Sequence, residues 1–100
     1  MSTLQVDVRD VAALSVRVNA LELSVDLADG RTITVPVAWF PHLANGSEAE
    51  RINWRLIGRG QGIHWPDLDE DISVESLLTG RRSRESDDSL RKWLERRKTI

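Results

Sequence analysis

The sequence lacks cysteine and tyrosine, and it contains little proline or methionine. Its 100 residues include no Cys and no Tyr, 3 Pro and 1 Met. Without cysteine, a disulfide framework, a thiolate metal site and a thiol nucleophile are all excluded. No apolar run approaches the ~18 residues that cross a bilayer. Charged residues lie between Met1 and Asp10, where a signal peptide would be apolar. We therefore expect a soluble, cytoplasmic protein.

Charge is unevenly distributed along the chain. The net charge is −2; residues 1–70 hold 6 Arg against 10 acidic residues, whereas residues 71–100 hold 8 Lys and Arg against 6 acidic residues. Because nucleic-acid affinity depends mostly on clustered basic side chains, the acidic part argues against a large phosphate-binding face. The composition, with 40% hydrophobic and 30% charged residues, is typical of a single globular domain.

Two alternating apolar patterns predict strands over residues 11–18 and 21–27. The side chains expected on the buried faces are Leu14, Val16 and Val18 in the first strand and Leu21, Leu23, Val25 and Leu27 in the second. Asp29-Gly30 predicts a hairpin turn into a third strand over residues 31–35. A small antiparallel sheet built around hairpin 21–35, with neighbouring strands, is the predicted centre of the fold.

Short helical or turn-rich segments are predicted after this sheet. Residues 37–43 are expected to bury their aromatic side chains, and Ser47 is expected to cap a helix over residues 48–54. Residues 58–62 predict a glycine-rich turn and residues 63–65 an extended segment. A helix over residues 74–78, capped by Ser73 or Asp71, is expected to end at Gly80.

The last part of the chain predicts a separate unit. Residues 81–89 contain no hydrophobic residue and indicate a linker, after which Leu90, Trp93 and Leu94 recur at helical spacing. We therefore predict an α+β fold with a domain over residues 1–80, followed over residues 81–100 by a polar linker and an amphipathic helix. Such a short helix is marginal alone, so it must dock on its own domain, on a second copy or on another protein.

The segment from Gly62 to Ser73, GIHWPDLDEDIS, resembles the signature of the DUF2442 family. The Asp29-Gly30 hairpin and residues 37–43, VAWFPHL, are also similar to that family's pattern, so the resemblance covers roughly residues 11–80. It implies a small α+β fold, a bacterial cytoplasmic source and frequent genetic company with a small toxin-like or otherwise uncharacterised protein. It implies no catalytic residue, and it does not cover residues 81–100.

Asp67, Asp69 and Asp71 alternate as the first ligands of a calcium loop do, but the rest of the loop does not fit. Ile72 stands where the loop needs Gly, and Leu78 stands where it needs a bidentate Glu. We instead expect these acidic residues to form a turn, to cap a helix and to pair with arginine side chains. No metal site is predicted.

Other chemical sites are equally poorly supported. His64 could act as a general base, but a half-buried ring bonded to backbone is the simpler interpretation. His42 is the other histidine, and neither HExxH nor GxSxG spacing occurs. Gly58, Gly60 and Gly62 lack the GK[ST] ending of a phosphate loop and predict a hairpin turn. We expect no enzymatic activity and no cofactor.

The remaining candidates are surfaces for a protein partner. Trp39, Trp54 and Trp65 are expected mainly in the core, with Trp65 the one expected to reach the surface. The candidate interaction residues are His64, Trp65, Asp67, Asp69, Leu90, Trp93, Leu94 and Arg97.

The first hypothesis is a non-enzymatic interaction or regulatory module, such as an antitoxin-like partner of a small protein encoded nearby, with homodimerisation left open. The alternative is a nucleic-acid-associated transcriptional regulator using the basic residues of the tail. It is weaker because acidic residues dilute those charges. A small hydrolase or metal enzyme at His64 and Asp67 has the least support.

Overall fold

The first three strands form an antiparallel sheet in the order β1-β2-β3 in the computed structural model, which describes residues 11–98. The strands are β1 (Ala13–Val18), β2 (Glu22–Leu27) and β3 (Thr32–Pro36). The predicted hairpin turn joins β2 to β3: the Leu27 amide donates to the Arg31 carbonyl at 2.8 Å, and Gly30 has a φ of 95°. Glycine adopts this left-handed conformation without steric cost, which explains the turn.

A second antiparallel sheet, in the order β4-β5-β6, follows in the sequence. It contains β4 (Arg55–Ile57), β5 (Gly62–Trp65) and β6 (Glu70–Ser73), and a 3₁₀ turn, η3 (Gly58–Gly60), joins the first two strands. The glycine-rich turn and the extended segment are therefore confirmed. Strands β4 and β6 were not predicted, because one is three residues long and the other is mostly polar.

Short helices connect and flank the sheets. They are η2 (Val37–Trp39), α1 (Pro41–Ala44), α2 (Glu48–Ile52) and α3 (Val74–Thr79). Ser47 caps α2 in a reciprocal capping box with Glu50, as the sequence indicates, although the helix ends two residues earlier than expected. Ser73 caps α3, and Gly80 ends it with a φ of 75°.

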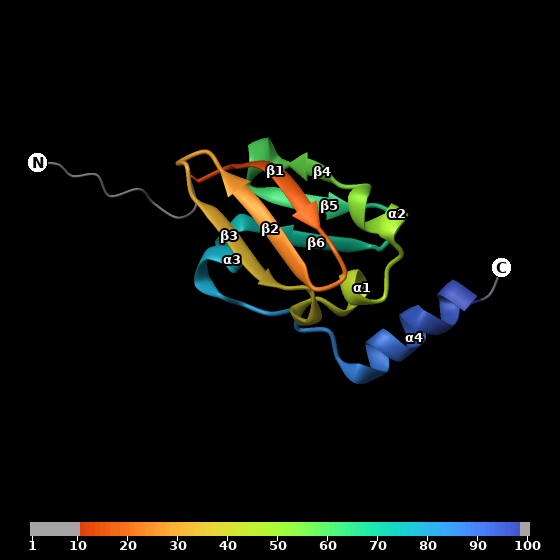
Figure 1. Ribbon diagram of the computed structural model, residues 1–100. Helices are drawn as coiled ribbons and strands as arrows, with labels where there is room; N and C mark the ends of the chain where they lie inside the picture. Colours follow the sequence, from red (N-terminus) through yellow and green to blue (C-terminus); the bar gives the residue numbers. More distant parts are fainter. Residues whose placement is uncertain (1–10, 99–100) are drawn as a thin grey trace, which may run out of the picture.

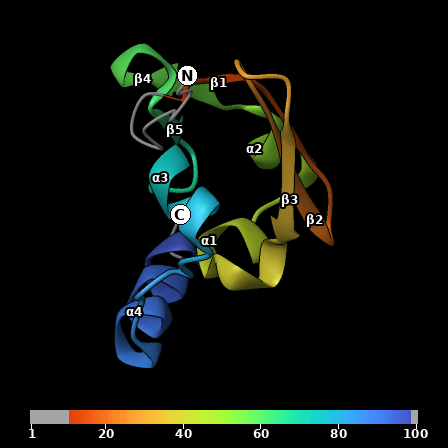
Figure 2. The same ribbon diagram turned by 90° about the vertical axis from the view of Figure 1, so that its left-hand side faces the viewer.

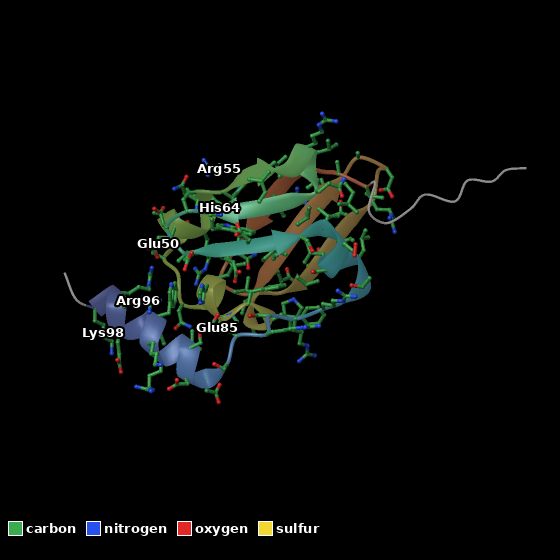
Figure 3. All side chains as sticks on the ribbon, turned by 180° about the vertical axis from the view of Figure 1, so that it is seen from behind. Glu50, Arg55, His64, Glu85, Arg96 and Lys98 are labelled. Carbon is green, nitrogen blue, oxygen red and sulfur yellow. The ribbon has the colours of Figure 1, made fainter. Side chains whose placement is uncertain are left out.

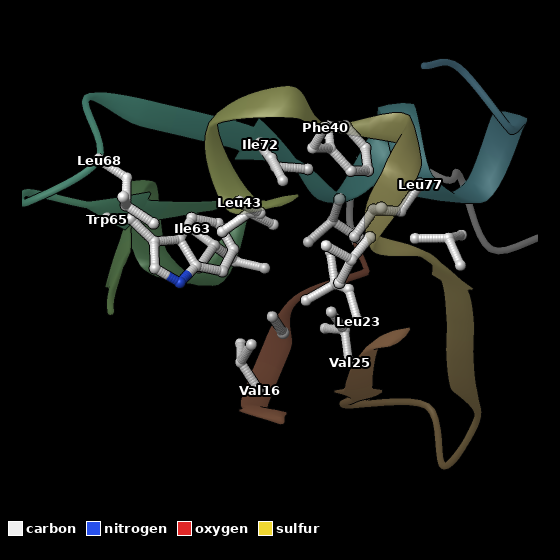
Figure 4. Close-up of a cluster of buried hydrophobic side chains, with 14 of the residues drawn as sticks. Val16, Leu23, Val25, Phe40, Leu43, Ile63, Trp65, Leu68, Ile72 and Leu77 are labelled. Carbon is white, nitrogen blue, oxygen red and sulfur yellow. The ribbon is translucent and has the colours of Figure 1, made fainter. Parts of the chain in front are cut away.

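The core lies between the two sheets, which face each other (Figures 1 and 2). Leu23 and Val25 point inward from the first sheet, and Ile63 and Trp65 point inward from the second (Figure 4). Leu43 of α1 fills the space between them and is fully buried. One continuous apolar cluster thus holds both sheets, as expected for a domain of this size.

Two leucines predicted to be buried are instead exposed. Leu14 is 62% and Leu21 78% exposed. A register irregularity between Ala13 and Ser15 turns Ala13 inward and Leu14 outward. Leu21 precedes β2, where the Asn19 side chain accepts the Leu21 amide hydrogen at 2.7 Å and forms the turn. The prediction of buried residues from strict alternation was therefore wrong where a bulge and a turn interrupt the strands.

The predicted amphipathic helix is present as α4 (Asp87–Lys98), after an irregular segment over residues 81–86. Figure 2 shows α4 extending away from the two sheets, beyond α1. Trp93 is its one buried residue within the described range, while Leu90 and Leu94 are half-buried. Residues 1–10, whose charges were expected to rule out a signal peptide, lie outside the described residues.

Candidate interaction site at the α4 junction

Trp93 attaches α4 to the rest of the molecule. Its ring stacks on the imidazole of His42 with centroids 3.9 Å apart and planes inclined by 3°. The guanidinium of Arg97, one helical turn later, lies 4.6 Å from the Trp93 ring centroid. Stacking and cation–π contacts of this kind add to the burial of apolar area. The junction, defined here as His42, Glu85, Trp93, Arg97 and Glu50, is thus docked within the same chain.

His42 is buried by this stack, and its ring nitrogens face different groups. Nδ1 lies 2.9 Å from the Leu68 carbonyl and 3.2 Å from the Asp69 carbonyl, so this nitrogen carries the hydrogen and donates it. Nε2 lies 3.2 Å from Oε1 of Glu85, without the angles of a hydrogen bond. Since an unprotonated Nε2 and a carboxylate are both acceptors, this contact becomes an ion pair only when the ring is protonated.

Two carboxyl groups near His42 have pKa values shifted in opposite directions. Burial raises the pKa of Glu70 to about 7, against the opposing effects of His42 and the Asp71 amide. A hydrogen bond from the Ser89 hydroxyl, 2.6 Å long, lowers the pKa of Glu85, and His42 lowers it further. We call the two sheets and the short helices packed with them, residues 11–80, the body. Figure 3 shows Glu85 in the segment that leads from the body into α4. The surroundings of His42 therefore combine Glu70, a carboxyl group outside the junction that resists ionisation, with Glu85, a junction carboxyl group that favours it.

Arg97 forms the second attachment of α4. One guanidinium nitrogen lies 2.7 Å from Oε1 of Glu50, and the other donates to the Asp67 carbonyl at 3.3 Å. The same Glu50 oxygen accepts the Ser47 amide at 2.8 Å in the capping box of α2. The Arg97 hydrogen bond is the largest cause that lowers the pKa of Glu50. One carboxylate thus caps α2 and anchors α4.

A hollow of about 360 Å³ lies along α4 itself. It is lined by Asp87, Leu90, Arg91, Leu94, Glu95 and Lys98, so an apolar centre is flanked by both signs of charge. Leu90 and Leu94 are half-buried, and apolar side chains that stay partly exposed inside a charged rim are typical of a protein-binding surface. We call these six residues the α4 face.

A larger, more polar cleft of about 500 Å³ lies between β6, α3 and the segment over residues 81–89. Its lining mixes carboxylates of Glu70 and Glu85 with arginines and serines. One of those arginines, Arg82, lies over the Trp39 ring at 4.8 Å and so is engaged within the chain. The mixed charge gives the cleft no single ligand preference.

The structure brings only part of the predicted interaction residues together. Leu90, Trp93, Leu94 and Arg97 share α4, and Asp67 meets Arg97 through its backbone. The prediction for Trp65 is wrong: this side chain is fully buried, and its indole donates to the Arg51 carbonyl at 3.0 Å. Its place on the central strand of the second sheet directs it into the core.

His64 and the acidic residues after it lie apart from the junction. His64 Nδ1 bonds to the carboxylate of Asp71 across the β5–β6 pair, so the expected backbone partner is wrong. Asp67 accepts a hydrogen bond from Asn53 at 2.8 Å, where pairing with an arginine side chain was expected. Asp69 has a φ of 52° and offers its carbonyl to His42. Within residues 11–98, no cluster of His, Asp and Glu is arranged to hold a metal ion.

The sequence analysis did not predict that His42, Glu70 and Glu85 lie close together in space. His42 is 26 residues from Leu68, and its contacts to Glu85 and Trp93 span still longer separations. No local pattern reports contacts of this range. The available signal was indirect: a histidine in an otherwise apolar segment, and a tryptophan in the apolar stripe of the last helix.

The comparison with protein families covers both sheets and the helices up to α3. A family model described as "Protein of unknown function (DUF2442)" matches residues 13–83. The chain belongs to the DUF2442 family. The match ends before α4 begins, so the DUF2442 signature covers the body and the start of the connecting segment but excludes the helix. A search of curated proteins finds no match.

Two solved structures are similar to this DUF2442 protein. One is the crystal structure of a protein of unknown function from Rhodospirillum rubrum, 25% identical, with a TM-score of 0.66 over 81% of this chain and 98% of the other. The second is the solution structure of an uncharacterized protein from Chromobacterium violaceum, 21% identical, with a TM-score of 0.63 over 87% of this chain and 76% of the other. Both support the α+β fold. Among the described helices, none is long and apolar enough for a membrane span.

Proposed function

We propose that this DUF2442 protein is a non-enzymatic protein-interaction module and that α4 is its recognition element. The observation that carries the proposal is the way α4 is attached. Trp93 and Arg97 dock the helix, whereas Leu90 and Leu94 remain half-buried beside an open hollow. Trp93 and Arg97 fix the helix in place, and Leu90 and Leu94 pack only partly against the core, so part of their apolar surface stays exposed.

The docking also addresses the energetic difficulty of a short recognition helix. A helix of 12 residues is marginal in water, so an unattached helix would have to fold when its partner binds. The Trp93 stack, together with acidic residues in the first turn and basic residues in the last, stabilises the helix beforehand. Preordering of this kind reduces the entropic cost of binding.

A finer version of the proposal makes the partner a small, toxin-like protein encoded nearby, with the DUF2442 protein as its antitoxin-like regulator in the cytoplasm. Residues 1–70 carry 10 acidic side chains against 6 Arg, which suits a basic partner. The body would then steer the encounter, and the α4 face would provide the apolar contact.

The alternative is a nucleic-acid-associated regulator that uses the basic residues of the tail. Those residues are Arg81, Arg82, Arg84, Arg91, Lys92, Arg96, Arg97 and Lys98. Arg91 and Lys92 are paired with Asp88, Arg97 is paired with Glu50, and Arg82 covers Trp39. Cations already paired with carboxylates offer little net charge to phosphates, so this alternative is weaker.

Photo-crosslinking in living bacteria tests the proposal directly. A photoreactive amino acid replaces Leu94 on the α4 face, and a matched control replaces Thr34, an exposed residue of β3. We expect one protein-containing adduct at position 94 that is absent at position 34. Adducts that disappear on nuclease treatment would establish the alternative instead. Identical protein adducts at both positions, or none at position 94, would refute α4 as the recognition element.

A further inference from the structure

We propose that the α4 face binds a second copy of this chain through an antiparallel pairing of the two α4 helices. This inference rests on the proposed function, because it names a second copy of this chain, in place of a small toxin-like protein, as the partner of the same surface. Three features of the α4 face support it: the order of its charges, the position of its leucines and the projection of α4 away from the sheets (Figure 2).

The charges along the α4 face alternate in a self-complementary order. From the start of the helix they are Asp87, Arg91, Glu95 and Lys98. In an antiparallel pair with its two-fold axis between Lys92 and Trp93, Asp87 lies level with Lys98 of the second copy. Arg91 lies within one residue, about 1.5 Å along the axis, of the level of Glu95 of the second copy. Each rim charge therefore lies near its opposite; Arg91 and Glu95 already pair within their own helix at 3.3 Å, so Asp87 and Lys98 form the distinctive pair between the chains.

The same axis aligns the apolar centre. Leu90 of one helix comes within one residue of the level of Leu94 of the other, and the two-fold axis repeats this contact. Four leucines then form the seam between the helices. Trp93 and Arg97 remain turned towards their own body, where they are already engaged. Leu90 and Leu94 also pack against the core of their own chain, but they are only half-buried, so the seam between the helices would be formed by the exposed parts of these leucines.

A parallel pairing has the opposite electrostatic outcome. It would place Asp87 against Asp87, Arg91 against Arg91 and Lys98 against Lys98. Like charges placed directly across a helix interface oppose association, and they would select against this orientation. The seam is short, so the antiparallel dimer is expected to be weak and reversible, with a Kd in roughly the micromolar range or above.

Reciprocal charge reversal tests this register. The variants Asp87→Lys and Lys98→Asp each place like charges opposite one another twice in their own homodimer. We expect sedimentation equilibrium to show each variant alone associating roughly three- to tenfold more weakly than the wild type. An equimolar mixture of the two variants restores both opposite-charge pairs, and it should associate about as well as the wild type. The double variant Asp87→Lys/Lys98→Asp should also recover association.

The equimolar mixture separates the effect of the substitutions on pairing between chains from their effect on the stability of α4. Each reversal also opposes the helix dipole, which circular dichroism of each variant measures separately. The mixture contains the same altered helices, so recovery there can only come from pairing between chains. A wild-type protein that stays monomeric at millimolar concentration overturns the inference. A dimer that neither weakens in the single variants nor recovers on mixing also overturns it.

Photo-crosslinking distinguishes failure of this inference from failure of the proposed function. An adduct at position 94 with the mass of two chains supports the antiparallel pair. An adduct with a different protein overturns self-pairing while leaving the interaction-module function intact. No protein adduct at position 94 would refute both.

Discussion

The ring of Trp93 lies parallel to that of His42, with centroids 3.9 Å apart, and this contact joins the last helix to the body. His42 is in turn fixed by the Leu68 carbonyl, in the turn between β5 and β6. The position of α4 therefore depends on the second sheet, through a histidine that lies between them.

Substitution Trp93→Ala is expected to release α4 while leaving both sheets folded. Trp93 is the buried anchor of α4, and a 12-residue helix without tertiary contacts is marginal in water. Amide hydrogen exchange should show loss of protection over residues 90–98, corresponding to about 2 kcal/mol or more of lost local stability. Protection of β2 and β5 should persist.

Two further variants control for other causes. Trp93→Phe keeps an aromatic ring beside His42, and it should retain much of the protection. Lys92→Ala removes an exposed neighbour that pairs only with Asp88 among the contacts described, and it should have little effect. Unchanged exchange of α4 in Trp93→Ala would show that the stack does not hold the helix.

Glu70 should make the protein less stable as pH rises from about 4.5 to 7. Burial raises its folded-state pKa from 4.5 to about 7, so the folded protein binds a proton that the unfolded chain has already released. Stability from this residue is thus complete below the unfolded pKa and is lost as pH passes through the folded value. Replacement by the permanently neutral Gln should remove a dependence of roughly 1–3 kcal/mol.

The measurement is urea unfolding of the wild type and Glu70→Gln across this pH range. The difference between the two curves isolates Glu70 from the other titrating groups. Glu75→Gln is the matched control, because Glu75 lies in the first turn of α3 outside the cleft. Parallel curves for wild type and Glu70→Gln would show that Glu70 titrates normally in the folded state.

The ion pair between Arg97 and Glu50 should have the reverse pH dependence. Arg97 lowers the pKa of Glu50 below 4.5, so the stabilisation is present above the unfolded pKa and is lost as pH falls through the folded value. Both side chains are partly sheltered, at 29% and 25% exposure. A double-mutant cycle with Arg97→Ala and Glu50→Ala should give a coupling of about 1 kcal/mol at neutral pH, vanishing in acid.

Ser47→Ala separates the two roles of Glu50. It removes the side-chain oxygen that caps α2 while leaving Arg97 and the Glu50 carboxylate in place. A loss of about 1 kcal/mol is expected from the cap alone, with the coupling of Arg97 to Glu50 retained. If the coupling also disappears in the Ser47→Ala background, the ion pair depends on the capping box.

Local sequence patterns predicted those parts of the fold that local interactions control. Asp29-Gly30 and Ser47 each act within a few residues, and the turn and the helix cap formed as expected. The buried position of Trp65 and the meeting of His42 with Trp93 depend on how distant segments pack, so no local pattern specifies them. Leu14 was misplaced because one irregularity in a strand reverses the side on which a residue points.

Gly60 is expected to be among the least replaceable residues in the described range. Its φ is 85°, and a Cβ atom added there would lie 2.9 Å from both the Ala12 Cβ and the Ala13 carbonyl oxygen. Because the obstacle includes backbone of the neighbouring sheet, the strain cannot be relieved by a side-chain rotation. Gly60→Ala should therefore lower the free energy of unfolding by about 2–4 kcal/mol, combining the left-handed backbone with steric overlap.

Gly30→Ala provides the matched control in urea unfolding. Gly30 has a similar φ of 95°, but nothing lies within 4 Å of an added Cβ atom. This variant should lose only the backbone preference, about 1 kcal/mol. The difference between the two variants then measures how closely η3 packs against the start of β1. Equal losses in both would mean that the contact between the two sheets at Gly60 can relax, and that backbone conformation alone requires glycine there.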